Sequence, residues 1–254
     1  MKKIFFLVSL LLTLAFGLGI SSASSYIFLS ADLNITDPLV GAQGSNVDPG
    51  NQQFFTNILQ DGSNVVVLES SYALFAQSVN SFYSTLPGKT STLVTGTITD
   101  AQLVGVDLFV SPDPIDSFTA NEITTFENLL AQGGSIFFIG DHAGAISTNQ
   151  IINDALTSLN SGMSIMPNSS FDIAAWHTAV GPQIATDSFT TSIQTLTYNA
   201  ASQVDGGTYL FFGSEGQPFV TYNTCNPVPI PGAIWLLGSG LFGLVTIRRR
   251  KAKA

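Results

Sequence analysis

The chain has 254 residues, enough for one domain of ordinary size with additional segments. Only 10% of the residues are charged and 45% are hydrophobic, a composition that excludes an intrinsically disordered chain. The formal net charge is −9, and from Ser24 to Pro229 a single cation, Lys89, stands against all 17 carboxylates. Such a surface repels phosphate backbones, so nucleic-acid binding is excluded.

The N-terminal segment has the order of a secretory signal. Met1–Lys3 is short and basic, and Ile4–Ile20 is apolar and uncharged. Ser21–Ala23 then places small residues where a signal peptidase cuts. Residues 1–23 are therefore predicted to be a signal peptide cleaved after Ala23. The alternative is an uncleaved N-terminal membrane anchor.

The exported region, predicted as residues 24–223, begins with alternating helices and strands. Asp48-Pro49 predicts the start of a helix with an apolar stripe. Asn64–Leu68 is a continuous β-branched run, typical of a strand buried on both faces. A second helix is expected over Tyr72–Phe82 and a short strand over Thr92–Val94.

A strand–helix–strand unit follows. Asp107–Val110 is predicted to be a strand and Ser111–Ser117 a loop, after which Thr119 and Glu122 form a capping box. The apolar run Ser135–Ile139 is the next strand. This βαβ unit requires parallel pairing and a right-handed crossover.

The last third has a looser pattern. A helix is expected over Ile151–Leu159, strands over Ile193–Thr197 and Tyr209–Phe212, and a hairpin partner over Phe219–Tyr222. The predicted fold class is α/β: a mostly parallel sheet in a three-layer, flavodoxin-like arrangement, with a β-rich C-terminal part.

Candidate chemistry gathers at one edge of this sheet. Loops that follow successive parallel strands share the carboxyl edge, where ligands of open α/β sheets bind. We therefore expect five side chains from three loops to converge there: Glu69, Asp113, Asp116, Asp141 and His142.

Residues 106–162 resemble the class I glutamine amidotransferase-like superfamily. The resemblance rests on the strand VDLFVSP, the helix ending in AQGGS and the strand-turn SIFFIGDHAG. The superfamily's Gly-x-nucleophile-x-Gly turn is matched by Gly140–Gly144, with His142 where the catalytic Cys stands. The resemblance implies the same three-layer fold. Cys225 is the only cysteine and falls in a predicted spacer, so glutamine hydrolysis through a thioester is not expected.

Asp141 and His142 support two interpretations. In one, His142, Asp141, Asp113 and His177 surround a divalent metal ion that activates water, as in a metal-assisted hydrolase. In the other, Asp141 accepts backbone N–H bonds in a structural turn and His142 fills the adjoining space.

His177 follows Trp176. This pair is expected either to line a sugar or nucleotide pocket or to pack in the half-buried interior, and packing is the favoured interpretation.

The loop Asp32–Asn51 is rich in Asp, Asn and Gly. Oxygen-rich loops bind Ca²⁺ outside the cell, but the spacing is not that of an EF-hand, and turn formation accounts for the same residues.

The C-terminal segment, predicted as a spacer plus signal over residues 224–254, has three parts. The motif Val228, Pro229, Ile230, Pro231 precedes an apolar stretch over 232–247, and a basic tail occupies 248–254. The apolar stretch is predicted to be a single membrane-spanning helix whose tail stays cytoplasmic.

This three-part order resembles the PEP-CTERM family of sorting signals in its Val-Pro-Leu-Pro-type variant, with Ile230 in place of the commoner residue. The resemblance implies export in a Gram-negative bacterium and recognition by an exosortase. It also implies cleavage near the proline motif and transfer from the inner membrane to the cell surface or matrix. A permanent single-pass anchor is the alternative.

Two functions follow from the sequence. The first is a cell-surface or matrix protein, processed by signal peptidase and exosortase, whose non-catalytic domain binds or structures extracellular polysaccharide. The second is a secreted metal-assisted hydrolase that acts at the edge carrying Asp141 and His142. No cofactor other than that divalent metal is implied.

Overall fold

The structure is a computed structural model that describes residues 24–36, 47–69 and 71–225. The predicted signal peptide with Ala23, the sorting motif 228–231, the helix 232–247 and the tail 248–254 lie outside the described residues. Within the described ranges, no helix has the length and apolar character needed to cross a membrane.

A seven-stranded sheet forms the centre, in the order β10-β11-β1-β5-β4-β2-β3. Five of its strands run parallel, and β11 and β10 continue the sheet antiparallel beyond β1. The predicted α/β class, the mostly parallel sheet and the antiparallel C-terminal pairing are therefore confirmed. The strands of this sheet are β1 (Ser25–Ser30), β2 (Asn64–Leu68), β3 (Thr90–Val94), β4 (Leu108–Pro112), β5 (Ser135–Ile139), β10 (Thr208–Phe212) and β11 (Pro218–Cys225).

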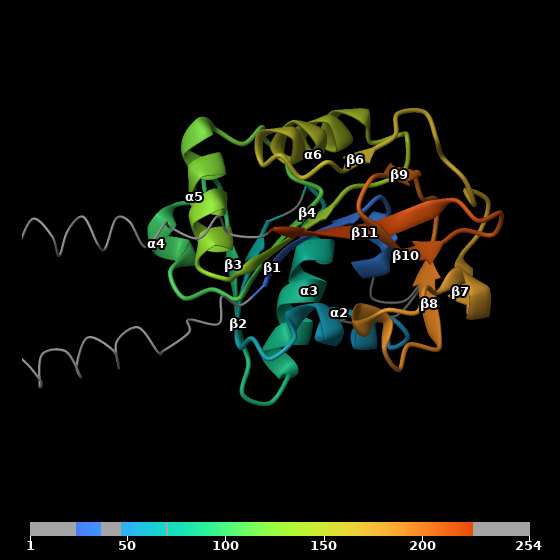
Figure 1. The fold of residues 1–254 in the computed structure, drawn as a ribbon, viewed down its shortest axis with the longest axis horizontal. Helices are drawn as coiled ribbons and strands as arrows, with labels where there is room; N and C mark the ends of the chain where they lie inside the picture. Colours follow the sequence, from blue (N-terminus) through green and yellow to red (C-terminus); the bar gives the residue numbers. More distant parts are fainter. Residues whose placement is uncertain (1–23, 37–46, 70, 226–254) are drawn as a thin grey trace, which may run out of the picture.

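Helices cover both faces of the sheet, which gives three layers (Figure 1). The strands are buried on both faces, so alternate residues face opposite helices: Val67 and Val110 pack on one side, Val66 and Phe109 on the other. On the first side lie α2 (Gln52–Leu59) and α3 (Ala73–Thr85), and on the second lie α4 (Asp100–Leu103), α5 (Ala120–Ala131) and α6 (Ile146–Ser158).

The parallel strands follow the flavodoxin order if counting starts at β2, because β3 lies on one side of β2 while β4 and β5 lie on the other. The N-terminal strand β1 occupies the fifth place. This strand, which begins two residues after the proposed signal peptidase site, was not predicted from the sequence.

Most predicted elements are present, with shifted ends. Helix α2 begins at Gln52 and not at Asp48, because Asp48 starts a turn whose carbonyl accepts from the amide groups of Asn51 and Gln52. Strand β4 continues through Ser111 and Pro112, which were expected to be in a loop.

The last third both completes the main sheet and adds two small sheets. Strand β11 pairs with β10 as the predicted hairpin partner and also with β1. The small sheets pair β6 (Ser164–Ile165) with β9 (Val204–Asp205), and β7 (His177–Val180) with β8 (Thr195–Tyr198). The 3₁₀ helices are η1 (Leu33–Thr36), η2 (Gly181–Gln183) and η3 (Ser188–Thr190).

Cys225 does not lie in a polar spacer as expected. It is the last residue of β11 and pairs with Ser25, whose hydroxyl donates to the Cys225 carbonyl at 2.8 Å. Its half-buried thiol packs against the hydrophobic core on the side of the sheet that α5 and α6 cover, and burial raises the pKa of the thiol. The folded domain therefore extends two residues beyond the predicted boundary at 223.

Candidate functional site

Four parallel strands end in carboxylates at one edge of the sheet. Asp32 follows β1, Asp141 follows β5, Asp113 follows β4 and Glu69 follows β2. The chain leaves β2 toward α3 on one face and leaves β4 toward α5 on the other, so the direction of winding switches between these two strands. An open cleft of about 400 Å³ lies at this point, lined by Ser71, Tyr72, Asp113, Pro114, Ile115, Asp141, His142, Gly144, Ala145, Ser147 and Thr148.

Asp113 is the buried centre of the cleft, with 3% of its surface exposed. Its backbone is left-handed (φ 44°), a conformation that costs free energy in a residue with a Cβ. The strain is held by hydrogen bonds on two sides: the Asp113 amide donates to the Ile139 carbonyl at 2.7 Å, and the Ser71 hydroxyl donates to the Asp113 carboxylate. Burial raises the pKa of Asp113, and the charge of Asp141 adds to this effect, while a hydrogen bond from Thr148 opposes it.

Asp141 and His142 form a tight turn between β5 and α6. The Asp141 Oδ1 accepts from the His142 amide at 2.7 Å and lies 3.1 Å from His142 Nδ1. Asn149, on the first turns of α6, secures the turn by bonding the Asp141 amide (3.0 Å) and carbonyl (2.7 Å). This arrangement supports the interpretation of Asp141 as a structural acceptor, with the His142 ring half exposed in the cleft.

The glycines of this turn are explained by close packing. A Cβ at Gly140 would lie 2.4 Å from Asn149 Oδ1, and a Cβ at Gly144 would lie 2.6 Å from His142 Nε2. His142 is a described residue and does not have a positive φ, so its backbone is not that of a strained nucleophile turn.

His177 does not line the cleft, whose lining includes only Asp113, Asp141 and His142 of the four predicted metal ligands. It lies in β7 opposite Tyr198, and the two rings pack with their centroids 5.6 Å apart. The Tyr198 hydroxyl in turn donates to Asp172 at 2.6 Å. His177 thus belongs to the packing of the small C-terminal sheet.

Among the described residues, no three His, Cys, Asp or Glu side chains come together in a way that could hold a metal ion. The predicted site made of Asp113, Asp141, His142 and His177 is therefore not formed. Two of its members are engaged elsewhere, Asp113 with Ser71 and Asp141 with the His142 amide.

In the described part of the loop Asp32–Asn51, carboxylates accept hydrogen bonds that form turns. The Asp32 carboxylate is fully buried and accepts from the amide of Asn34 at 2.8 Å and that of Asn199 at 2.9 Å. Asp48 accepts from the Gly50 amide at 2.8 Å. Burial raises the pKa of Asp32 to about 8, and the neighbouring charge of Asp141 contributes.

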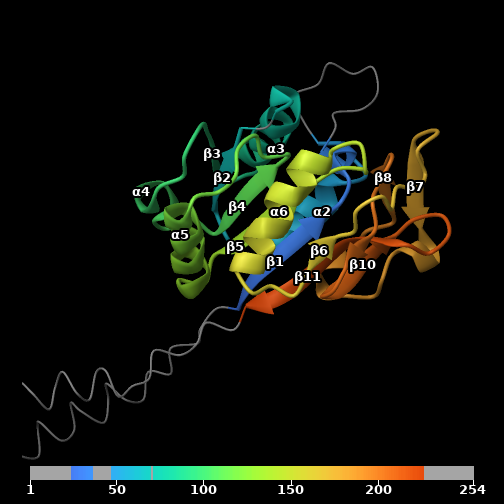
Figure 2. The same ribbon diagram turned by 90° about the horizontal axis from the view of Figure 1, so that it is seen from above.

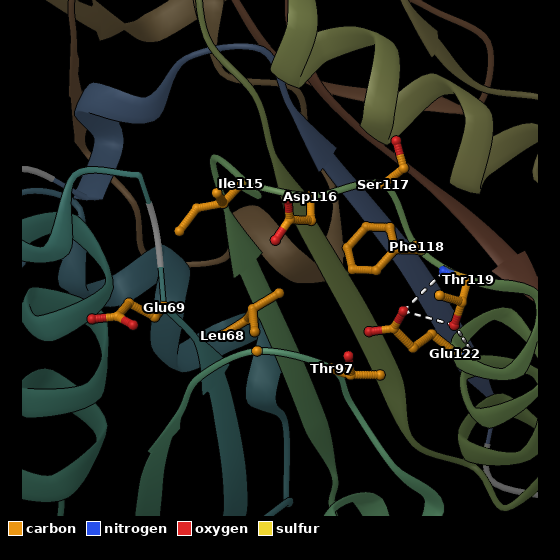
Figure 3. Close-up of a pocket in the computed structure, with 10 residues that line it drawn as sticks. Leu68, Glu69, Thr97, Ile115, Asp116, Ser117, Phe118, Thr119 and Glu122 are labelled. Atoms are coloured by element: carbon orange, nitrogen blue, oxygen red, sulfur yellow. Dashed lines mark hydrogen bonds between the residues drawn. The ribbon is translucent and has the colours of Figure 1, made fainter.

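Glu69 and Asp116 line a second, smaller pocket on the other side of the β4–α5 loop (Figure 3). The five residues therefore do not all converge on one site. Asp113, Asp141 and His142 line the cleft, whereas Glu69 and Asp116 line the pocket.

The sequence analysis missed several residues that build the cleft. Thr148 and Asn149 are buried near the start of α6 and were not among the candidates. Ser71, which follows β2, belongs to one of the three loops that the sequence placed at this edge. A signal for the first two existed, since two adjacent polar residues stand on the sheet-facing side of an amphipathic helix just after the Gly140–Gly144 turn.

Comparison with protein-family models gives no match, and comparison with curated protein sequences also gives none. Among solved structures, the chain is similar to one described as "mmIFT52 N-terminal domain", with 16% sequence identity and a TM-score of 0.43. The alignment covers 51% of this chain and 69% of that chain. A likeness this low carries no argument about function.

Proposed function

We propose that this chain is an exported, exosortase-processed cell-surface or matrix protein whose α/β domain binds extracellular polysaccharide without catalysis. In this proposal, residues 1–23 direct export, and the segment from Val228 onward anchors the chain in the inner membrane until processing. The polysaccharide binds at the cleft around Asp113, Asp141 and His142.

The observation that carries the proposal is the position of the cleft relative to the ends of the domain. Strand β1 begins at Ser25, beside Cys225 at the end of β11, so both ends of the described domain lie at the amino edge of the sheet (Figure 2). The cleft lies at the carboxyl edge, one strand length away, which is about 17–20 Å for a strand of this size. A domain held by either end would therefore present the cleft away from its attachment.

The lining of the cleft suits a sugar. Its floor is polar, with Asp113, Asp141 and Thr148, while Tyr72 and Ile115 on its rim are 63% and 57% exposed. A sugar ring offers an apolar face to such a rim and hydroxyl groups to carboxylates. None of the described residues that line the cleft is Lys or Arg, so an anionic ligand is disfavoured.

A binding role is also supported by how the polar groups are used. The Asp113 carboxylate accepts from Ser71, and Asp141 accepts from the His142 amide, so both acids already hold loops in place. The resemblance to amidotransferase-like domains is consistent with this role, because His142 stands where that chemistry would need a thiol.

The test is a binding panel of neutral, anionic and amino-bearing glycans with the purified chain. We expect retention of neutral glycans without cleavage, and at least a tenfold loss of affinity in Asp141→Asn. The matched control Asp154→Asn, on the exposed side of α6, should bind as the wild type does. Release of shortened products, or unchanged binding by Asp141→Asn, would contradict the proposal.

A further inference from the structure

We propose that the cleft and the second pocket form one groove along the carboxyl edge, and that a linear neutral polysaccharide binds across both. This inference rests on the proposed function and extends it to the length of chain that is bound.

The two depressions adjoin each other, because the same two segments of chain line both. Ile115, 57% exposed, belongs to both linings. The segment after β2 gives Glu69 to the pocket and Ser71 to the cleft. The β4–α5 loop likewise turns Asp113 into the cleft and Asp116 into the pocket.

The pocket combines an apolar floor with unbonded polar groups. Leu68 and Phe118 form the apolar part, and Figure 3 shows the Phe118 ring and the Asp116 carboxylate across the pocket from Thr97. Within the described ranges, the side chains of Thr97, Asp116 and Ser117 make no hydrogen bond to the protein. Their capacity therefore remains for the hydroxyl groups of a ligand whose ring covers the apolar floor.

The walls of the pocket are held in place independently of any ligand. Glu122, only 5% exposed, accepts from the Ile98 amide at 2.9 Å through one carboxylate oxygen. Its other oxygen accepts from the Thr119 amide at 2.8 Å and the Thr119 hydroxyl at 2.9 Å. This one side chain joins the β3–α4 loop to the start of α5, so binding would not have to order either wall.

Size argues for one extended site and not for two. The pocket has a volume of about 210 Å³, below the range of about 300–1,000 Å³ typical of ligand sites, whereas the cleft at about 400 Å³ falls within it. The pocket is therefore an extension that receives the next units of a chain already bound in the cleft.

Charge selects the class of polymer. The described residues of the two linings include five carboxylates and no Lys or Arg: Glu69, Asp113, Asp116, Glu122 and Asp141. A polyanionic chain would be repelled along the whole groove, while hydroxyl groups of a neutral chain can donate to these acceptors.

Calorimetry with neutral glucan, mannan and galactan oligosaccharides, from about two to about six units long, tests this inference. In the wild-type chain, we expect affinity for the best series to rise roughly tenfold or more with length. In the pocket variant Asp116→Asn with Ser117→Ala, both exposed residues, the rise should disappear while disaccharide affinity is kept. Asp141→Asn should weaken every length, and the control Asp154→Asn none.

The outcomes separate the two proposals. The groove proposal is overturned if disaccharides bind and longer chains bind no more tightly. It is also overturned if the pocket variant still binds longer chains more tightly than disaccharides. Either result leaves the proposed function standing. Absence of binding to all three neutral series overturns both. A preference for amino-bearing over neutral oligosaccharides overturns the neutral class assigned to the groove.

Discussion

Individual residues at the carboxyl edge act mainly as structural acceptors. Asp32, Asp113 and Asp141 follow adjacent parallel strands, and each accepts a hydrogen bond from its own or a neighbouring loop. Burial raises the pKa of Asp32 and of Asp113, and the neighbouring charge of Asp141 adds to this effect at both carboxyl groups.

Asp32 makes stability depend on pH. Its pKa is about 8 in the folded state and near 3.8 when exposed, so the folded protein binds the proton more tightly. Stability from this group is therefore present below about pH 4 and is lost as pH rises through 8, at most about 6 kcal/mol at about 1.4 kcal/mol per pKa unit. Asp32→Asn should remove this loss, which urea unfolding from pH 4 to 8 would measure. If the Asp32→Asn variant loses stability with rising pH as steeply as the wild type, Asp32 is not the source of this pH dependence.

At the scale of elements, the sequence predicted correctly the features that depend on contacts between residues close together in the chain. The capping box of Thr119 and Glu122 lies where the sequence placed it, at the start of α5. Strand β1 was missed because its role is entirely non-local: it pairs with β5 and β11, more than 100 residues away. The same reason applies to β7, whose pairing with β8 was invisible from His177 and its neighbours.

The two residues of the α5 cap should differ in importance. Thr119→Ala removes one acceptor and should cost about 1 kcal/mol of unfolding free energy. Glu122→Ala also leaves the buried Ile98 amide without its acceptor and should cost on the order of 2–3 kcal/mol.

The matched control is Thr99→Ala, in the capping box of the four-residue helix α4. Thr99 is exposed, so its loss should cost about 0.5 kcal/mol in the same unfolding assay. Equal costs for Glu122→Ala and Thr99→Ala would contradict the bridging role of Glu122.

At the scale of the whole molecule, the antiparallel addition of β11 beside β1 determines which edge carries the chain ends. Because β11 runs opposite to β1, its last residue returns to the edge where β1 begins. The cleft, the pocket and every loop after a parallel strand are at the opposite edge. In the proposed function, attachment and binding would thereby be separated by the sheet itself.

This separation can be measured in the unprocessed form. Replacing Val228–Pro231 by Ala should leave the chain in the inner membrane. In a Cys225→Ser background, a fluorophore at Asp61→Cys, on the amino edge, should be quenched by lipid-borne nitroxides more than one at Ile115→Cys, on the cleft rim. Arrival of the Ala variant at the cell surface, or stronger quenching at 115, would contradict the arrangement.

The sequence by itself determined the fold class, most helices and strands and the edge where polar residues gather, because burial periodicity, helix caps and the alternation of strands with helices are read from short stretches of chain. The tertiary structure alone decided which of those residues meet. It placed Asp113, Asp141 and His142 in one cleft and Glu69 and Asp116 in another pocket, and it moved His177 into a small sheet. It also gave Asp32 an interior position. These outcomes depend on crossovers and pairings between distant segments, whose geometry no local pattern contains.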